Sequence, residues 1–149
     1  MSIDINQVAI DCMRAINEKI KNLKRLNIIV AGKTGVGKST LINSIFREEL
    51  AETGIGKPIT KHMKTLSKPD FPLTIYDTKG LEMGNDVQAE VKKEIIQTIK
   101  DGVYSKDANR AIHCLWYCIN AASDRIEDRE IEWLRSFTEE NKETQVPVI

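Results

Sequence analysis

The sequence predicts an α/β fold in three layers, with helices on both faces of a mostly parallel sheet that includes one antiparallel hairpin. A short β-branched run at residues 26–31 leads directly into a glycine-rich loop and then into a helix-forming segment. Segments with strand-like and helix-like spacing alternate along the rest of the chain. The pair Pro69-Asp70 separates two short strand-like runs and indicates the hairpin turn.

The first elements follow from the spacing of apolar residues. These recur at steps of three and four between residues 3 and 26, which predicts an amphipathic helix. Residues 26–31 (LNIIVA) are typical of a strand that is buried on both faces of a sheet. Residues 38–46 are expected to form the next helix, and residues 62–66 and 73–76 the two strands of the hairpin.

Two helices and two strands are expected in the second half. Residues 111–119 (AIHCLWYCI) predict a central strand, in which we expect His113 to be a hydrogen-bonded core residue. The final residues, VPVI, predict the opening of a further strand. A helix over residues 87–99 would bury one stripe, made of Val91, Ile95, Ile96 and Ile99. A helix over residues 126–137 would turn Ile131, Leu134 and Phe137 inward and leave Glu127, Asp128 and Glu130 in solvent.

Composition limits the class of protein. A length of 149 residues suits one domain, which we expect at residues 26–149, with the helix of residues 1–25 preceding it. The 22 basic and 22 acidic residues cancel, so the chain has no overall electrostatic bias toward nucleic acid or membranes. Cys12, Cys114 and Cys118 lie in apolar runs, which favours buried thiols in a reducing compartment such as the cytoplasm. No apolar run approaches the about 20 residues that span a bilayer.

The glycine-rich loop, GKTGVGKST, predicts a binding site for a nucleoside triphosphate. It matches the pattern GxxxxGK[ST] between a strand and a helix, where glycines and the helix N-terminus direct backbone N–H groups at phosphates. Lys38 would approach the β and γ phosphates, and the Ser39 hydroxyl can ligate Mg²⁺. The loop residues expected to contact the nucleotide are Gly32, Thr34, Gly35, Val36, Gly37, Lys38, Ser39 and Thr40.

A second motif, Asp77-Thr78-Lys79-Gly80, follows the strand at residues 73–76. In open α/β sheets, ligands bind at the carboxyl ends of strands, so Asp77 can hold Mg²⁺ through water and the Gly80 N–H can reach the γ phosphate. The glycine loop fits two classes of nucleotide-binding protein. It has the general pattern of nucleoside triphosphatases, but a group of deviant-Walker ATPases also carries a lysine at the position of Lys33. Between Lys38 and Asp77 there is room for only one helix, one loop and a hairpin.

With these motifs, residues 26–149 resemble the GTP-binding domain of the translation-factor-related GTPases, in particular the Era-like and septin-like families. In the deviant-Walker ATPases the aspartate strand comes much later, so the resemblance favours a GTPase and a solvent-facing Lys33. It implies GTP and GDP as ligands, Mg²⁺, slow hydrolysis, and two switch segments ordered by the γ phosphate. The family's catalytic roles would be taken by Lys38, Thr60 and Gly80, and its metal site by Ser39, Thr60 and Asp77.

The switch threonine is open between two positions. Thr60 is favoured because Pro58-Ile59-Thr60 is similar to the Pro-x-Thr of several Era-like proteins, and Thr53 is the alternative. Leu81 stands where Ras-type enzymes place the glutamine that orients water, and leucine cannot form that hydrogen bond. The resemblance therefore implies slow turnover, and a second protomer or another partner that completes the site. The motifs do not identify the effector, whether a protein or the ribosome.

The motif that reads guanine in this family, Asn/Thr-Lys-x-Asp after the next strand, is not present in the sequence. Residues 141–144 (NKET) are a false match, because threonine replaces the aspartate and the segment precedes the strand. We therefore expect the chain to be part of a longer GTPase. Two alternatives stay open, an assembly module that nucleotide stabilises with negligible turnover, and a deviant-Walker ATPase.

Overall fold

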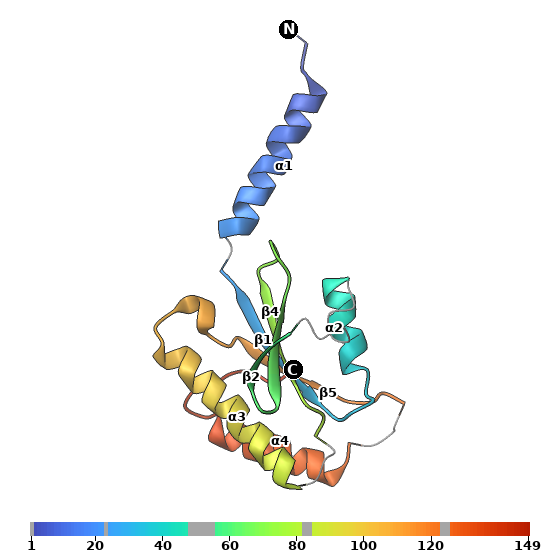
Figure 1. Cartoon of the computed structure of the whole chain (residues 1–149), viewed down its shortest axis with the longest axis vertical. Coiled ribbons are helices and arrows are strands. Elements are labelled where there is room, and N and C mark those ends of the chain that lie inside the picture. The colour runs from blue at the N-terminus through green and yellow to red at the C-terminus, as the bar shows by residue number, and fades with distance from the viewer. Residues whose placement is uncertain (1, 23, 48–55, 82–84, 123–125) are drawn as a thin grey trace.

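The computed structural model describes residues 2–22, 24–47, 56–81, 85–122 and 126–149. Within them, helices pack on both faces of a five-stranded sheet whose strand order is β2-β3-β4-β1-β5 (Figure 1). The elements are α1 (Ile5–Asn22), β1 (Leu26–Gly32), α2 (Lys38–Phe46), β2 (Lys57–Thr60), β3 (Met63–Ser67), β4 (Leu73–Thr78), α3 (Asn85–Tyr104), the 3-10 turn η1 (Ala108–Arg110), β5 (Cys114–Cys118) and α4 (Asp128–Glu140). The predicted α/β class is confirmed.

The sheet combines parallel and antiparallel strands. β1 pairs in parallel with β4 on one side and with β5 on the other. β3 is antiparallel to β4, which confirms the predicted hairpin, and its turn holds Asp70 in a left-handed conformation with φ 60°. β2 was not predicted. Its four residues are mostly exposed and show no alternation of burial, and Pro58 is tolerated there because β2 lies at the edge of the sheet.

Two apolar cores lie on opposite faces of the sheet. One lies under α2 and contains Ile28, Val30, Ile42, Phe46, Leu66, Leu73 and Ile75. The other lies under α3 and α4 and includes Ile29, Ala31, Met63, Leu81, Val91, Ile95, Ile96, Ile99, Leu115 and Phe137. Successive residues of β1 therefore serve opposite cores, as predicted for a strand buried on both faces. The predicted buried stripe of α3 is also confirmed.

The inward face of α4 differs from the prediction. Phe137 is buried, but Glu130 and Trp133 are buried with it, whereas Ile131 and Leu134 are half-buried. Glu130 tolerates burial because its carboxylate accepts hydrogen bonds from the Tyr117 hydroxyl at 3.0 Å and from the Glu127 N–H at 3.0 Å. The Trp133 ring stacks on Phe137, with ring centroids 5.6 Å apart.

The strand predicted at residues 111–119 is shorter than the apolar run. His113 lies just before β5, where its Nδ1 accepts a hydrogen bond from the Asn27 N–H at 2.9 Å. Its hydrogen bonding was thus predicted correctly, but the residue is exposed and is not part of the core. On the far side of β5, Leu115 forms an isolated parallel bridge with Val148, in the direction expected for the strand predicted there, although the last residues form no assigned strand.

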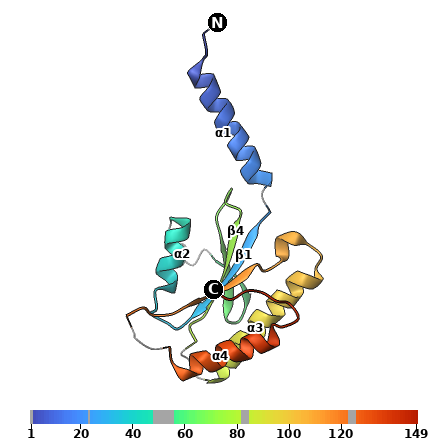
Figure 2. The same cartoon turned by 180° about the vertical axis from the view of Figure 1, so that it is seen from behind.

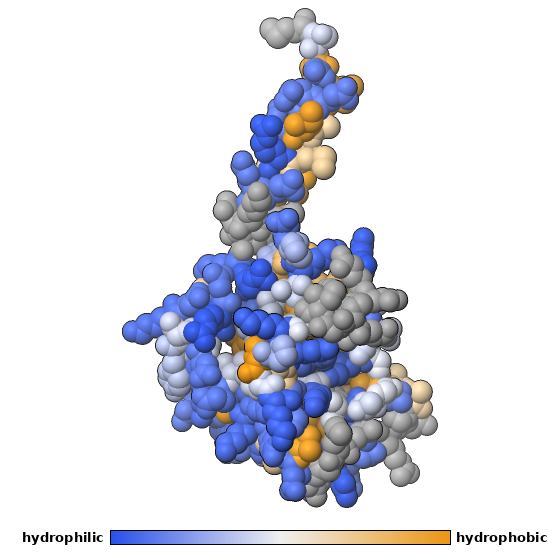
Figure 3. All heavy atoms as spheres, viewed as in Figure 1, coloured by the Kyte–Doolittle hydropathy of each residue, from blue (hydrophilic) through white to orange (hydrophobic). Residues whose placement is uncertain are grey.

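α1 extends away from the sheet, as the two opposite views show (Figures 1 and 2). It begins after Asp4, whose carboxylate accepts the Asn6 N–H at 3.0 Å. Apolar side chains follow the helix and are exposed to solvent (Figure 3), including Ile5, Val8, Met13 and Ile16. Of the three free thiols, Cys12 on α1 is exposed and Cys114 and Cys118 are half-buried, so the prediction of buried thiols was wrong for Cys12. Among the described residues, no helix is both long and apolar enough to cross a membrane.

Candidate functional site

The glycine loop connects the end of β1 to the first turn of α2. Gly35 and Gly37 have positive φ values of 80° and 96°, a conformation that glycine adopts without steric cost. Gly37 is also the N-cap of α2, and no side chain caps this helix end. The N–H groups of the first turn are consequently available to an anion, which the helix dipole also favours.

Lys38 and Asp77 meet at the centre of the site. The Lys38 Nζ lies 2.7 Å from the Asp77 Oδ1, and both side chains are only 12% exposed. The same ammonium group also donates to the Thr78 carbonyl. Asp77 reaches this position because β4 runs parallel to β1 in register, with Asp77 opposite Val30, at the edge where the loop begins. The structure thus brings together two residues that the sequence placed in separate motifs.

A cavity of about 650 Å³ opens beside this pair, within the range of small-molecule sites. Three segments line it, within residues 33–40, 58–64 and 77–80. Of the predicted nucleotide contacts, Gly32 and Val36 are not among the lining residues. Its charged lining side chains are Lys33, Lys38, Lys61, Lys64 and Lys79 with Asp77, together with His62, whose charge depends on its protonation. This lining favours an anionic ligand.

The Asp77-to-Gly80 motif is packed closely against the glycine loop. A Cβ at Gly80 would lie 2.0 Å from the Thr34 Oγ1 and 2.9 Å from the Thr34 nitrogen, so only glycine fits without displacing the loop. The Leu81 N–H donates to the Gly32 carbonyl at 3.2 Å. The Leu81 side chain is buried in the core under α3 and is not among the residues that line the cavity. It therefore cannot act on a water molecule in the cavity.

Lys33 does not face solvent as predicted. Its ammonium group forms an ion pair with the Glu127 carboxylate, and its side chain is 17% exposed. The hydrogen bond from Lys33 and its positive charge lower the pKa of Glu127. The pair joins the glycine loop to the start of α4. Sequence spacing could not reveal it, because the two residues are far apart in the chain.

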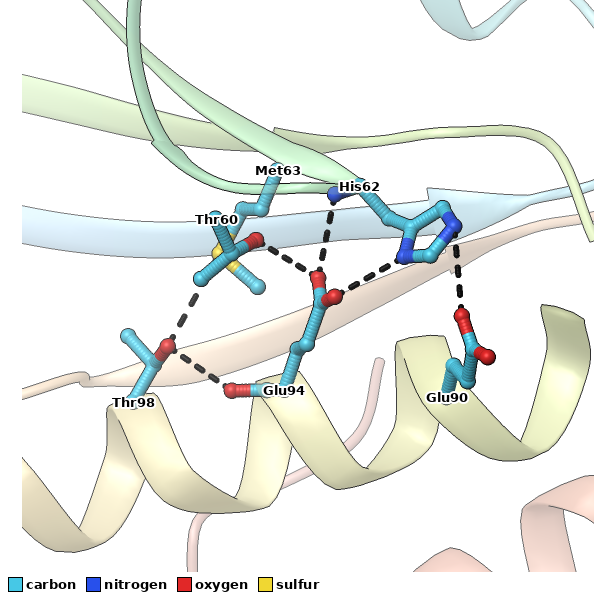
Figure 4. Close-up of polar contacts among 6 residues, drawn as sticks. All are labelled: Thr60, His62, Met63, Glu90, Glu94 and Thr98. Atoms are coloured by element: carbon cyan, nitrogen blue, oxygen red, sulfur yellow. Dashed lines mark hydrogen bonds and ion pairs between the residues drawn. The ribbon is translucent and has the colours of Figure 1, made fainter.

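Thr60 lies at the end of β2 with its hydroxyl directed at α3 (Figure 4). The hydroxyl donates to the Glu94 Oε2 at 2.5 Å, and the His62 N–H donates to the same oxygen at 3.2 Å. The His62 Nδ1 lies 2.8 Å from the Glu94 Oε1, and its Nε2 lies 3.6 Å from a carboxylate oxygen of Glu90. Both carboxylate oxygens of Glu94 are therefore engaged by the segment that follows β2.

Sequence reasoning missed Glu94, although Glu90 and Glu94 are spaced to share one face of α3. Burial alone would raise the pKa of Glu94, but the hydrogen bonds from Thr60 and His62 outweigh it and lower the pKa. Thr53, the alternative switch threonine, lies outside the described residues.

The false guanine motif has a structural role. Asn141 is the C-cap of α4 and is buried, and its amide nitrogen donates to the Val146 carbonyl at 2.7 Å. Its side-chain oxygen accepts the Thr144 hydroxyl at 2.6 Å. These bonds shape the turn between α4 and the last strand segment.

Most of the chain matches the sequence model of a known family. Residues 27–149 match the sequence model of the family described as "50S ribosome-binding GTPase". The chain belongs to this GTPase family. The predicted resemblance is thereby confirmed, and the ATPase alternative gains no support.

The chain is also similar to parts of longer proteins. It is 36% identical to GTPase Der of Jannaschia sp. over 86 residues, which is 56% of this chain and 17% of that protein. It is 27% identical to cell division control protein 11 of Encephalitozoon cuniculi over 128 residues, 77% of this chain and 48% of the relative. The chain thus spans less than half the length of these relatives.

A solved structure supports the fold. The crystal structure of a dimerization-deficient mutant of Toc33 from Arabidopsis thaliana superposes with a TM-score of 0.54. The match covers 82% of this chain and 47% of that one, with 22% identical residues.

Proposed function

We propose that this GTPase binds GTP with Mg²⁺ in the lysine-lined cavity and hydrolyses it slowly to GDP, acting as a nucleotide-dependent switch. The observation that carries this proposal is the Lys38–Asp77 pair, which joins the glycine loop to the end of β4 beside the cavity. Membership of a GTPase family supports guanine nucleotide as the ligand. Residues 26–149 would form the nucleotide-binding part, and residues 1–25 a separate helix.

The residues present fit the roles that nucleotide binding requires. Lys38 would leave Asp77 for the β and γ phosphates, and the Gly80 N–H would donate to the γ phosphate. Ser39 and Asp77 offer the oxygen ligands that Mg²⁺ prefers, and the Ser39 hydroxyl makes no hydrogen bond within the described part of the chain. Bound Mg²⁺ would neutralise charge on the β and γ phosphates. Thr60 could complete this ligand set only by leaving Glu94.

The burial of Leu81 favours low activity in a single protomer. No group at this position can orient the attacking water, because the side chain belongs to the core. We propose that a second copy, docking through the nucleotide-binding face, supplies the missing group. The competing function is an assembly module that nucleotide stabilises without turnover. The free, half-buried thiols of Cys114 and Cys118 suit a reducing compartment such as the cytoplasm.

The rate of GTP hydrolysis per protomer, measured across protein concentrations, distinguishes these functions. For an enzyme activated by a second copy, we expect the rate per protomer to rise at least roughly tenfold as dimers form, since one positioned catalytic group typically contributes about 10²–10⁴-fold. Sedimentation with GDP and with a non-hydrolysable GTP analogue would report the dimer directly. A rate near zero at every concentration, with dimers present, would support the assembly module.

A further inference from the structure

Thr60 and Asp77 point to opposite faces of the sheet. Thr60 pairs with Met63 across β2 and β3, and Met63 packs in the core under α3. Cross-strand partners share a face, in agreement with the Thr60 hydroxyl bonding to Glu94 of α3. Asp77 pairs with Lys64, the residue after Met63, so its side chain points to the opposite face of the sheet. There it meets Lys38, on the face of the glycine loop.

Thr60 and Asp77 also lie on strands that are not neighbours in the sheet. β3 lies between β2 and β4, so the strand of Thr60 and the strand of Asp77 are roughly 10 Å apart. Ligands of Mg²⁺ lie only about 2.1 Å from the ion. Thr60 therefore cannot join a metal held by Ser39 and Asp77 until β2 moves and the hydroxyl leaves Glu94.

From this arrangement we propose that Glu94 sets the preference of the site between GTP and GDP, by competing with the metal for Thr60. This rests on the proposed function, in which Thr60 becomes a metal ligand when GTP is bound. GDP lacks the γ phosphate that orders the switch, so it leaves the bond between Thr60 and Glu94 intact. Its bond to Thr60 stabilises the empty and GDP-bound states, and the binding of GTP must break this bond.

The two partners of this contact differ in how firmly they are held. α3 is anchored in the core by its buried stripe, including Ile95, which has no exposed surface. β2 has four residues, lies at the edge of the sheet, and is irregular between Pro58 and Thr60. β2 is therefore the element that moves, while Glu94 stays in place.

A metal bound by His62, Glu90 and Glu94 would be another explanation of this cluster. The geometry does not favour it, because no group of three His, Cys, Asp or Glu side chains among the described residues could hold a metal ion. The carboxylate of Glu94 already accepts hydrogen bonds on both oxygens from the chain itself.

The test compares Glu94→Gln with Glu90→Gln, a matched control one turn away on α3 that faces the same imidazole but does not contact Thr60. The dissociation constants of GDP and of a non-hydrolysable GTP analogue are measured with Mg²⁺. Glu94→Gln should change the ratio of the two dissociation constants roughly fivefold in favour of the GTP analogue. The reason is that the hydrogen bond from Thr60 would then go to a neutral amide and not to a charged carboxylate. Glu90→Gln should leave the ratio unchanged.

Two further measurements separate the possible failures. In a Thr60→Val background, Glu94→Gln should no longer shift the ratio, and a shift that persists there would overturn the role of Thr60. In the unmodified chain, the His62 amide hydrogen, which is bonded to Glu94, should exchange faster with the GTP analogue than with GDP. Equal exchange, or equal ratios for the two glutamine variants, would reject the proposal for Glu94. Absence of any nucleotide binding by the unmodified chain would instead reject the proposed function.

Discussion

Lys38→Ala is expected to weaken the binding of GTP and of GDP roughly 100-fold, since a charged hydrogen bond to phosphate is among the strongest polar contacts in a binding site. The Lys38 ammonium group already sits at the edge of the cavity, 2.7 Å from the Asp77 carboxylate. Nucleotide phosphates would take over this interaction. Titration calorimetry with Mg²⁺ and each nucleotide measures the change.

The same substitution leaves Asp77 without its ammonium partner, in a position where its side chain is only 12% exposed. Some loss of stability is therefore expected as well, and thermal melting of the variant must show that it is folded at the temperature of the titration. Lys61→Ala is the matched control, because Lys61 is an exposed lysine that lines the same cavity. If both variants lost affinity equally, general charge and not Lys38 would account for binding.

Those parts of the site that depend on local sequence could be predicted. The glycine loop lies between a strand and a helix whose patterns are clear. Asp77 lies near the end of a strand whose place next to β1 follows from the fold class. The buried stripe of α3 was predicted for the same reason, since Val91 and Ile95 recur at helical spacing. Each inference used residues within one or two elements.

Contacts between distant residues could not be predicted. Thr60 and Glu94 are 34 positions apart, and their contact depends on how α3 packs against the edge of the sheet. The face of α4 was predicted only in part, since Phe137 is buried and Leu134 packs against the core, but Trp133 and Glu130 were missed. Two neighbouring stripes both pass through Phe137. Helical spacing could not choose between the stripe of Leu134 and that of Trp133, and the hydrogen bonds that allow Glu130 to be buried come from other elements and from the helix cap.

Gly32→Ala is expected to lower the free energy of unfolding by roughly 3 kcal/mol, by combining overpacking with backbone strain. An added Cβ would lie 2.6 Å from the Cys118 carbonyl oxygen, and Gly32 has a φ of 152°. The obstructing atom belongs to the β5 backbone, which is paired in register with β1 at this residue. It cannot move without disturbing the sheet. Urea denaturation measures the loss.

Gly35→Ala provides the matched comparison within the same loop. Its φ of 80° also favours glycine, but an added Cβ would meet no atom within 4 Å. Only the conformational cost remains, about 1 kcal/mol. Equal losses for the two variants would mean that the contact with β5 contributes nothing. A larger loss for Gly32→Ala would show that the first glycine of the loop serves the sheet, because β1 continues through it to Cys118, whereas Gly35 serves only the shape of the loop around its ligand.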